Sequence, residues 1–168
     1  MLEFQEKQEL QKRMMIIWVI WGAMFVSIGI YIIIGVILAG SGMKIAFDIP
    51  LETVKIALLV FSLAQVTFAI MLKKMILMRV TPVNTTPSGR NDLITTAAGK
   101  YNAAIIMSLA ISEVIAVLGL IYFLISHDYW AFYMYCAISA GSMIMIRPTV
   151  AELEGVAEAL KKSEAMRT

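Results

Sequence analysis

The sequence predicts an all-α fold: an integral membrane four-helix bundle with a C-terminal amphipathic cytoplasmic helix. Of its 168 residues, 60% are hydrophobic, and the mean hydropathy is +0.82. A soluble domain usually holds about 45–50% apolar residues, so this excess indicates lipid rather than water around much of the chain. Four apolar stretches are long enough to cross the hydrocarbon, for which a helix needs about 20 residues. The alternation typical of a membrane β-barrel is missing from the sequence.

The four spans are expected to form one domain, residues 1–147, and residues 148–168 form a tail. The first span carries no charge, and its apolar run is much longer than the roughly 7–15-residue core of a signal peptide, so we expect it to be retained. The second continues past two lysines near its end, and the third is interrupted only by Glu113. The predicted spans cover residues 14–39, 54–78, 101–125 and 129–146.

The Lys and Arg residues are distributed unevenly over the segments that flank these spans. Of the 14, only Lys44 and Lys55 follow the first span directly; the others precede the first span, surround the loop after the second, or lie in the tail. Such an excess marks the cytoplasmic side. Both termini are therefore predicted to be cytoplasmic, in a membrane that we expect to be a prokaryotic inner (plasma) membrane. An aromatic belt is then expected at the outer interface, formed by Tyr129, Trp130, Tyr133 and Tyr135.

The tail has the pattern of an amphipathic helix. Thr149 and Glu152 have the spacing of a capping box, in which each side chain would satisfy a backbone N–H at the start of the helix. Apolar residues then recur at helical intervals, at Val150, Leu153, Val156, Ala157 and Leu160. Three interpretations stay open: a helix on the membrane surface, a helix docked on a partner, and a plain solvated end.

Glu113 is the only charged residue in the third span, about 18 Å along the helix from Tyr101. Half of a hydrocarbon core is about 15 Å, so this carboxyl is expected near the midplane, where burial disfavours its charged form. Gln65 is the one strongly polar side chain in the middle of the second span, and we expect it to be the partner of Glu113. Hydroxyl groups complete a candidate ion-binding set: Thr67, Ser108 and Ser112. The set could hold a proton or a small cation, it could simply join two helices, or Glu113 could contact another subunit.

Small residues predict where helices approach closely in the membrane. Gly22 and Gly29 share one face of the first span, and Ala137 and Gly141 share one face of the fourth. The pattern does not distinguish contacts within one chain from contacts between copies.

The stretch "GRNDLITTAAGKYNAAIIMSLAISEVIAVLGLIYFLI" resembles part of a known family. A polar loop with Arg90 precedes a helix that carries Glu113, and "AVLGL" follows. In these features the stretch is similar to the loop and second helix of the proteolipid (c) subunit of rotary ATP synthases. The resemblance implies that Glu113 is a reversible proton or cation site, with Gln65 as a possible helper.

No nucleophile–base pair and no cluster of metal ligands emerges from the sequence, so we expect no enzyme, no cofactor and no metal site. The formal charge of +2 is small and gives no reason to expect nucleic acid as a partner. The expected partners are the lipid bilayer and either further copies of the chain or other membrane subunits. Two functions stay open: proton- or cation-linked transport, and a non-catalytic accessory or assembly subunit of a larger membrane complex.

Overall fold

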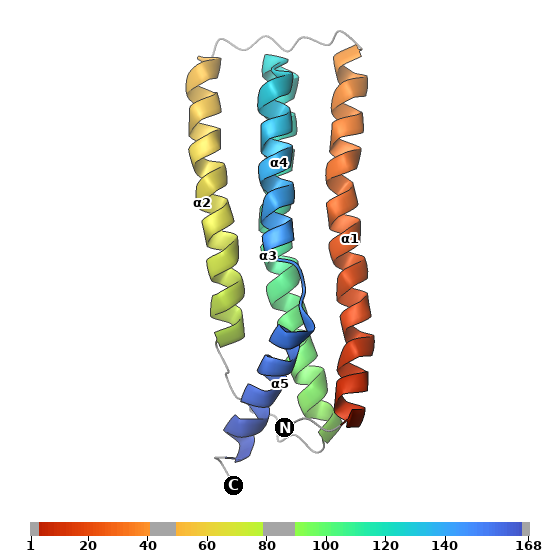
Figure 1. Ribbon diagram of the computed structural model, residues 1–168. Helices are drawn as coiled ribbons and strands as arrows, with labels where there is room; N and C mark the ends of the chain where they lie inside the picture. Colours follow the sequence, from red (N-terminus) through yellow and green to blue (C-terminus); the bar gives the residue numbers. More distant parts are fainter. Residues whose placement is uncertain (1–3, 41–49, 79–89, 166–168) are drawn as a thin grey trace.

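The computed structural model describes residues 4–40, 50–78 and 90–165, and these residues fold into five helices. No strand occurs within these ranges, so the predicted all-α fold is confirmed there (Figure 1). Lys44 and residues 79–89 of the loop after the second span, which contribute to the predicted orientation, lie outside the described residues. The helices are α1 (Phe4–Gly40), α2 (Leu51–Met78), α3 (Arg90–Ser126), α4 (Tyr129–Met145) and α5 (Val150–Ala165).

Three of the helices contain stretches that are long and apolar enough to cross a membrane. These stretches are Leu10–Gly40, Leu51–Met78 and Thr95–Ser126, in α1, α2 and α3. α4 has 17 residues, a length of about 25 Å, and it meets the same criterion only together with α5 as a pair bent by 49°. The predicted fourth span is therefore a helix, but a shorter one than the other three.

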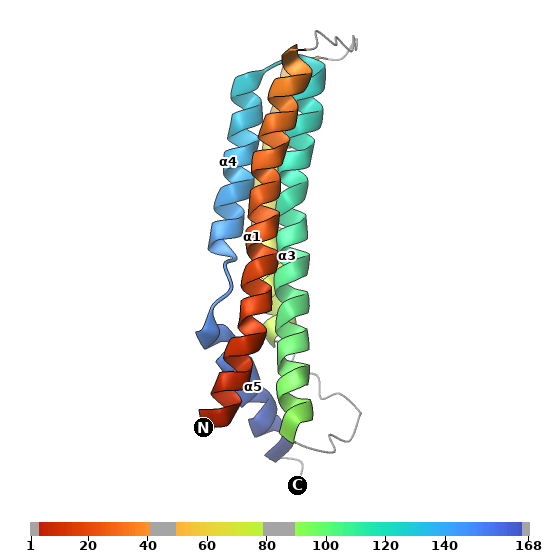
Figure 2. The same cartoon turned by 90° about the vertical axis from the view of Figure 1, so that its right-hand side faces the viewer.

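α3 is the central helix of the bundle and contacts all four others. Figure 1 shows α2 and α1 on opposite sides of the pair formed by α3 and α4, and Figure 2 shows α3 and α4 on opposite sides of α1. The lower ends of α1 and α3 extend beyond the end of α4, and α5 packs beside them. α3 therefore makes more of the interhelical contacts than any other helix.

Apolar side chains fill the interior, but many remain outside it. In an 18-residue apolar window of α3, 44% of the residues are buried, whereas only 11% are buried in the corresponding windows of α1 and α2. The outward faces of α1 and α2 carry large exposed side chains such as Val26, Ile37, Val60 and Phe68. Apolar surface of this extent is typical of helices that lie against lipid or against other membrane helices.

Among the described glycines, the closest approaches to another helix occur at two positions that the sequence did not single out. A Cβ atom on Gly119 would lie 2.6 Å from Cβ of Tyr135, and a Cβ atom on Gly35 would lie 2.8 Å from Cε1 of Phe132. In contrast, no atom lies within 4 Å of a Cβ built on Gly22, Gly29 or Gly141. The glycines expected at helix contacts thus face away from the rest of the described chain.

The amphipathic tail helix docks on its own bundle. Its buried side chains face α1 and α3 and join the main hydrophobic cluster. The predicted apolar stripe is confirmed at four of its five positions, which the chain itself covers, whereas Val150 is exposed. The capping box is wrong, because the Glu152 carboxylate accepts hydrogen bonds from Lys73 and Tyr101. The buried residues of this stripe are Leu153, Val156, Ala157 and Leu160.

Candidate functional site

Two ion pairs delimit a belt of the bundle in which Glu113 is the only charged residue of the described chain. Lys55 pairs with Asp128 at 2.7 Å near one end of α2, and Lys73 pairs with Glu152 at 2.8 Å near the other. The two lysines are 18 residues apart, about 27 Å along a helix, which is close to the thickness of a hydrocarbon core, about 30 Å. Glu113 lies between the two levels on α3, and it is half-buried.

The partners of Glu113 come from α1. Its Oε1 atom lies 2.6 Å from Oγ of Ser27 and 2.7 Å from the hydroxyl oxygen of Tyr31. Ser27 and Tyr31 are four residues apart, so they lie one turn from each other on the same face of the helix. This face of α1 therefore presents two hydroxyl groups to a single carboxyl oxygen.

Counting hydrogen atoms shows which form of Glu113 this arrangement suits. Oγ of Ser27 also lies 2.7 Å from the Met24 carbonyl oxygen, so three short contacts need three hydrogens. The Ser27 and Tyr31 hydroxyls supply one hydrogen each, and an ionised carboxylate supplies none. A protonated Glu113 supplies the third: it donates to Ser27, which donates to the carbonyl oxygen, while Tyr31 donates to Glu113. The geometry thus accommodates the neutral acid with every contact satisfied.

The expected pairing of Glu113 with Gln65 is not what the structure has. Oε1 of Gln65 is buried and has no hydrogen-bond partner among the described residues, and the two hydrogen-bond contacts of Glu113 lead to Ser27 and Tyr31 of α1 instead. The reason is the rotation of α3: Ser112 precedes Glu113 by one residue, which turns it by about 100° around the helix, and it contacts α4. The i, i+4 spacing of Ser27 and Tyr31 in a charge-free span was the signal in the sequence for the true partners.

The predicted serines form a separate cluster between α3 and α4. Ser112 Oγ lies 2.7 Å from Oγ of Ser142 and donates to the Ser108 carbonyl oxygen, and Ser139 Oγ donates to the Ser112 carbonyl oxygen. Oγ of Ser108 is buried without a partner. Thr67 is exposed and donates to the Leu63 carbonyl oxygen of its own helix, so it lies outside this cluster. The structure therefore does not bring the five predicted residues together as one ligand set.

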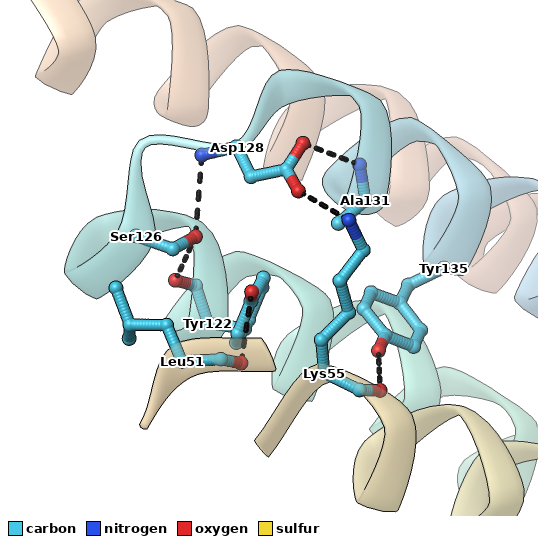
Figure 3. Close-up of polar contacts among 7 residues, drawn as sticks. All are labelled: Leu51, Lys55, Tyr122, Ser126, Asp128, Ala131 and Tyr135. Atoms are coloured by element: carbon cyan, nitrogen blue, oxygen red, sulfur yellow. Dashed lines mark hydrogen bonds and ion pairs between the residues drawn. The ribbon is translucent and has the colours of Figure 1, made fainter. Parts of the chain in front are cut away.

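A second polar network closes the opposite end of the bundle from α5 (Figure 3). Oδ1 of Asp128 accepts the backbone N–H of Ala131 at 3.0 Å and so caps α4, while its Oδ2 accepts from Lys55. The hydrogen bond from Lys55 and then the one from Ala131 lower the pKa of Asp128. Tyr135, expected in the exposed aromatic belt, is instead fully buried and donates to the Lys55 carbonyl oxygen at 2.8 Å.

The remaining belt residues and potential ligands can be placed as well. Tyr129, Trp130 and Tyr133 are exposed near the start of α4, as an aromatic belt requires. Within the described ranges, no three His, Cys, Asp or Glu side chains come together as metal ligands. Cys136 is buried as a free thiol.

Comparisons of the chain with models of protein families, with curated proteins and with solved structures give no match. The resemblance of the Glu113 helix to the proteolipid subunit therefore stays a prediction.

Proposed function

We propose that this chain is a four-span integral membrane protein in which Glu113 binds and releases a proton during proton-linked transport. The observation that carries the proposal is the contact of one Glu113 oxygen with the hydroxyls of Ser27 and Tyr31. These hydroxyls satisfy a neutral acid, and they also stabilise the carboxylate after the proton leaves, because both can donate to it. Ionisable residues inside a membrane are rare and usually mark a functional site, such as a proton pathway.

A proton fits this site better than a metal cation does. Na⁺-like or Ca²⁺-like ions in proteins are held by several oxygen atoms whose lone pairs face the ion. Here the hydroxyl hydrogen of Tyr31 is directed toward the carboxyl oxygen and that of Ser27 toward the Met24 carbonyl oxygen, and among the described residues no second acidic group lies in the belt. The proposal therefore favours proton-linked over cation-linked transport.

The proposed topology has four spans, with both termini on the cytoplasmic side of a prokaryotic plasma membrane. α4 is about 5 Å shorter than a hydrocarbon core of about 30 Å, a mismatch that local bilayer thinning or flanking residues can absorb at modest cost. The exposed tyrosines and tryptophan at the start of α4 support an interface at that level.

An accessory or assembly role is the second candidate. Gly22, Gly29 and Gly141 face away from the described chain, where a helix of another subunit or another copy can approach closely. Native mass spectrometry from nanodiscs tests this role. A stoichiometric foreign subunit that remains bound would support it, and a particle that contains only this chain would argue against it.

Proton flux in proteoliposomes tests the transport proposal. The purified chain is reconstituted, an outward potassium gradient with valinomycin drives protons, and an internal pH dye reports the flux. We expect proton flux above that of empty liposomes. Glu113→Gln should lower this flux at least about tenfold, because a positioned proton-transferring side chain typically contributes about 10²–10⁴-fold to a rate. Glu158→Gln, the same change at an exposed site of α5, should leave the flux unaltered. Equal flux in Glu113→Gln and wild type would reject the proposal.

A further inference from the structure

A buried lysine connects the inner end of α2 to the start of α5. Lys73 is only 7% exposed, and its Nζ atom lies 2.9 Å from Oε1 and 2.8 Å from Oε2 of Glu152. The same Nζ atom is 3.5 Å from the carbonyl oxygen of Ile146, the last residue before the link between α4 and α5. Among the described residues, the anionic partner of this buried ammonium group is thus supplied by α5.

A buried tyrosine of α3 completes the junction. Tyr101 is fully buried, and its hydroxyl oxygen accepts the backbone N–H of Thr149 at 2.8 Å. Its one hydrogen is shared between the Thr149 carbonyl oxygen at 3.2 Å and Oε2 of Glu152 at 3.0 Å. Residues 147–149 are not helical, so this hydroxyl holds the point at which the chain turns from α4 into α5.

The rest of the attachment of α5 is apolar. Leu153, Val156, Ala157 and Leu160 are buried against α1 and α3, while Ala159 on the opposite side of α5 is exposed. The axis of α5 is bent by 49° from that of α4. The short non-helical link therefore leaves α5 attached to the bundle by one apolar stripe and one polar junction.

We propose that Lys73, Glu152 and Tyr101 form a latch that controls whether α5 is docked or released. A buried ammonium group is tolerated when it is paired, and removing its partner is strongly unfavourable. Docking of α5 is therefore favoured by the charge of Lys73, and any change that removes the Glu152 charge weakens docking. Release exposes the apolar stripe of α5 on the cytoplasmic side. This device is separate from Glu113 and does not depend on the proposed transport.

Thiol labelling compares the two faces of α5 directly. In a Cys136→Ala background, Ala157→Cys reports the docked face and Ala159→Cys reports the exposed face with the same chemical change. With the latch intact, we expect a maleimide reagent to label Ala157→Cys at least about tenfold more slowly, because labelling must wait for local opening. Equal rates at the two positions would overturn the proposal, since α5 would then not be docked.

Variants of the latch test its control over docking. Glu152→Gln is expected to accelerate labelling of Ala157→Cys at least about tenfold, because it leaves the Lys73 charge unpaired. Adding Lys73→Met should restore much of the protection, since no buried charge remains. Tyr101→Phe keeps the ion pair and should accelerate labelling less than Glu152→Gln does. If Glu152→Gln leaves the ratio of the two labelling rates unchanged while helical content is retained, the stripe alone holds α5 and the latch is rejected. If Glu152→Gln lowers helical content, the same ratio of labelling rates is measured in Tyr101→Phe. An unchanged ratio in that variant would then reject the latch.

Discussion

At the scale of single residues, hydroxyl groups around one carboxyl define the site. Ser27 and Tyr31 reach the same oxygen of Glu113, and Ser27 passes its own hydrogen to a backbone carbonyl. With a neutral Glu113, each of these three contacts has a hydrogen atom. With an ionised Glu113, only two hydrogens are available for the three contacts. The chemical state of Glu113 is thus linked to two residues of another helix.

Infrared spectroscopy measures that state independently of transport. In lipid, we expect the proton-bound form of Glu113 to give a carbonyl stretching band that shifts in D₂O. Glu113→Gln should remove the band, and Glu158→Gln should leave it. Spectra in which Glu113→Gln removes no such band would contradict a proton-binding Glu113.

Tyr31→Phe removes one donor to Glu113 while retaining the ring. A lost hydrogen bond of this kind typically costs about 0.5–1.5 kcal/mol of unfolding free energy. Denaturation monitored by circular dichroism in detergent measures this cost. Tyr133→Phe, the same change at an exposed ring, provides the control, and equal stability of the two variants would contradict the role of Tyr31.

At the scale of helices, close packing depends on where a glycine faces. Gly119→Ala places a methyl group 2.6 Å from Cβ of Tyr135, so the two backbones must separate. Such overpacking typically costs about 1–3 kcal/mol. The unfolding midpoint of Gly119→Ala should therefore fall.

The same substitution at Gly22 should not lower the stability of the protein and should tend to raise it. No atom lies within 4 Å of the added methyl group there, and alanine is favoured over glycine inside a helix by up to about 1 kcal/mol. Gly22→Ala should be at least as stable as wild type in the same unfolding measurement. A loss of stability comparable to that of Gly119→Ala would show that another copy covers this glycine.

The stability that Asp128 contributes at the start of α4 should depend on pH. Its pKa is lowered in the folded state, first by Lys55 and then by the N–H of Ala131. A depressed pKa contributes stability above the unfolded value of about 3.9, and that contribution is lost as the pH falls through the folded value. Asp128→Asn should therefore lower the unfolding midpoint at pH 7, and the difference from wild type should shrink below about pH 4. A difference that stays constant down to that pH would contradict the ion pair.

At the scale of the whole molecule, paired charges lie at two levels of the bundle. The pairs Lys55–Asp128 and Lys73–Glu152 bound a belt about as thick as a hydrocarbon core, and Glu113 lies inside it. α5 and the first turns of α1 and α3 lie beyond the belt on one side. This division supports a bundle in lipid with a small helical portion at one face.

Protease digestion of sealed vesicles tests whether both ends of the chain lie on the same side of the membrane. Tags at the two ends of the chain should respond together to an impermeant protease, because an even number of spans returns the chain to the same side. Cleavage of one tag with full protection of the other would contradict the four-span topology.

Much of the fold follows from local sequence. Runs of apolar residues predicted where α1, α2, α3 and α4 lie, because a helix in lipid satisfies its own backbone hydrogen bonds and needs little more than length and hydrophobicity. The amphipathic stripe of α5 was also visible, since its buried and exposed faces differ in polarity. Glu113 was also recognisable in the sequence, because it is the one charged residue within a long apolar run.

By itself, the sequence determined the all-helical class, the apolar belt and the one acid within it. Only the tertiary structure decided that Glu113 faces Ser27 and Tyr31 rather than Gln65, and that α5 docks through Lys73. Helices that are apolar on every side carry no polar face to indicate their rotation, so hydropathy does not specify which side chains meet. Rotation and axial register come from packing across the bundle, at positions such as Gly119, where the fit of one side chain sets the distance between two helices.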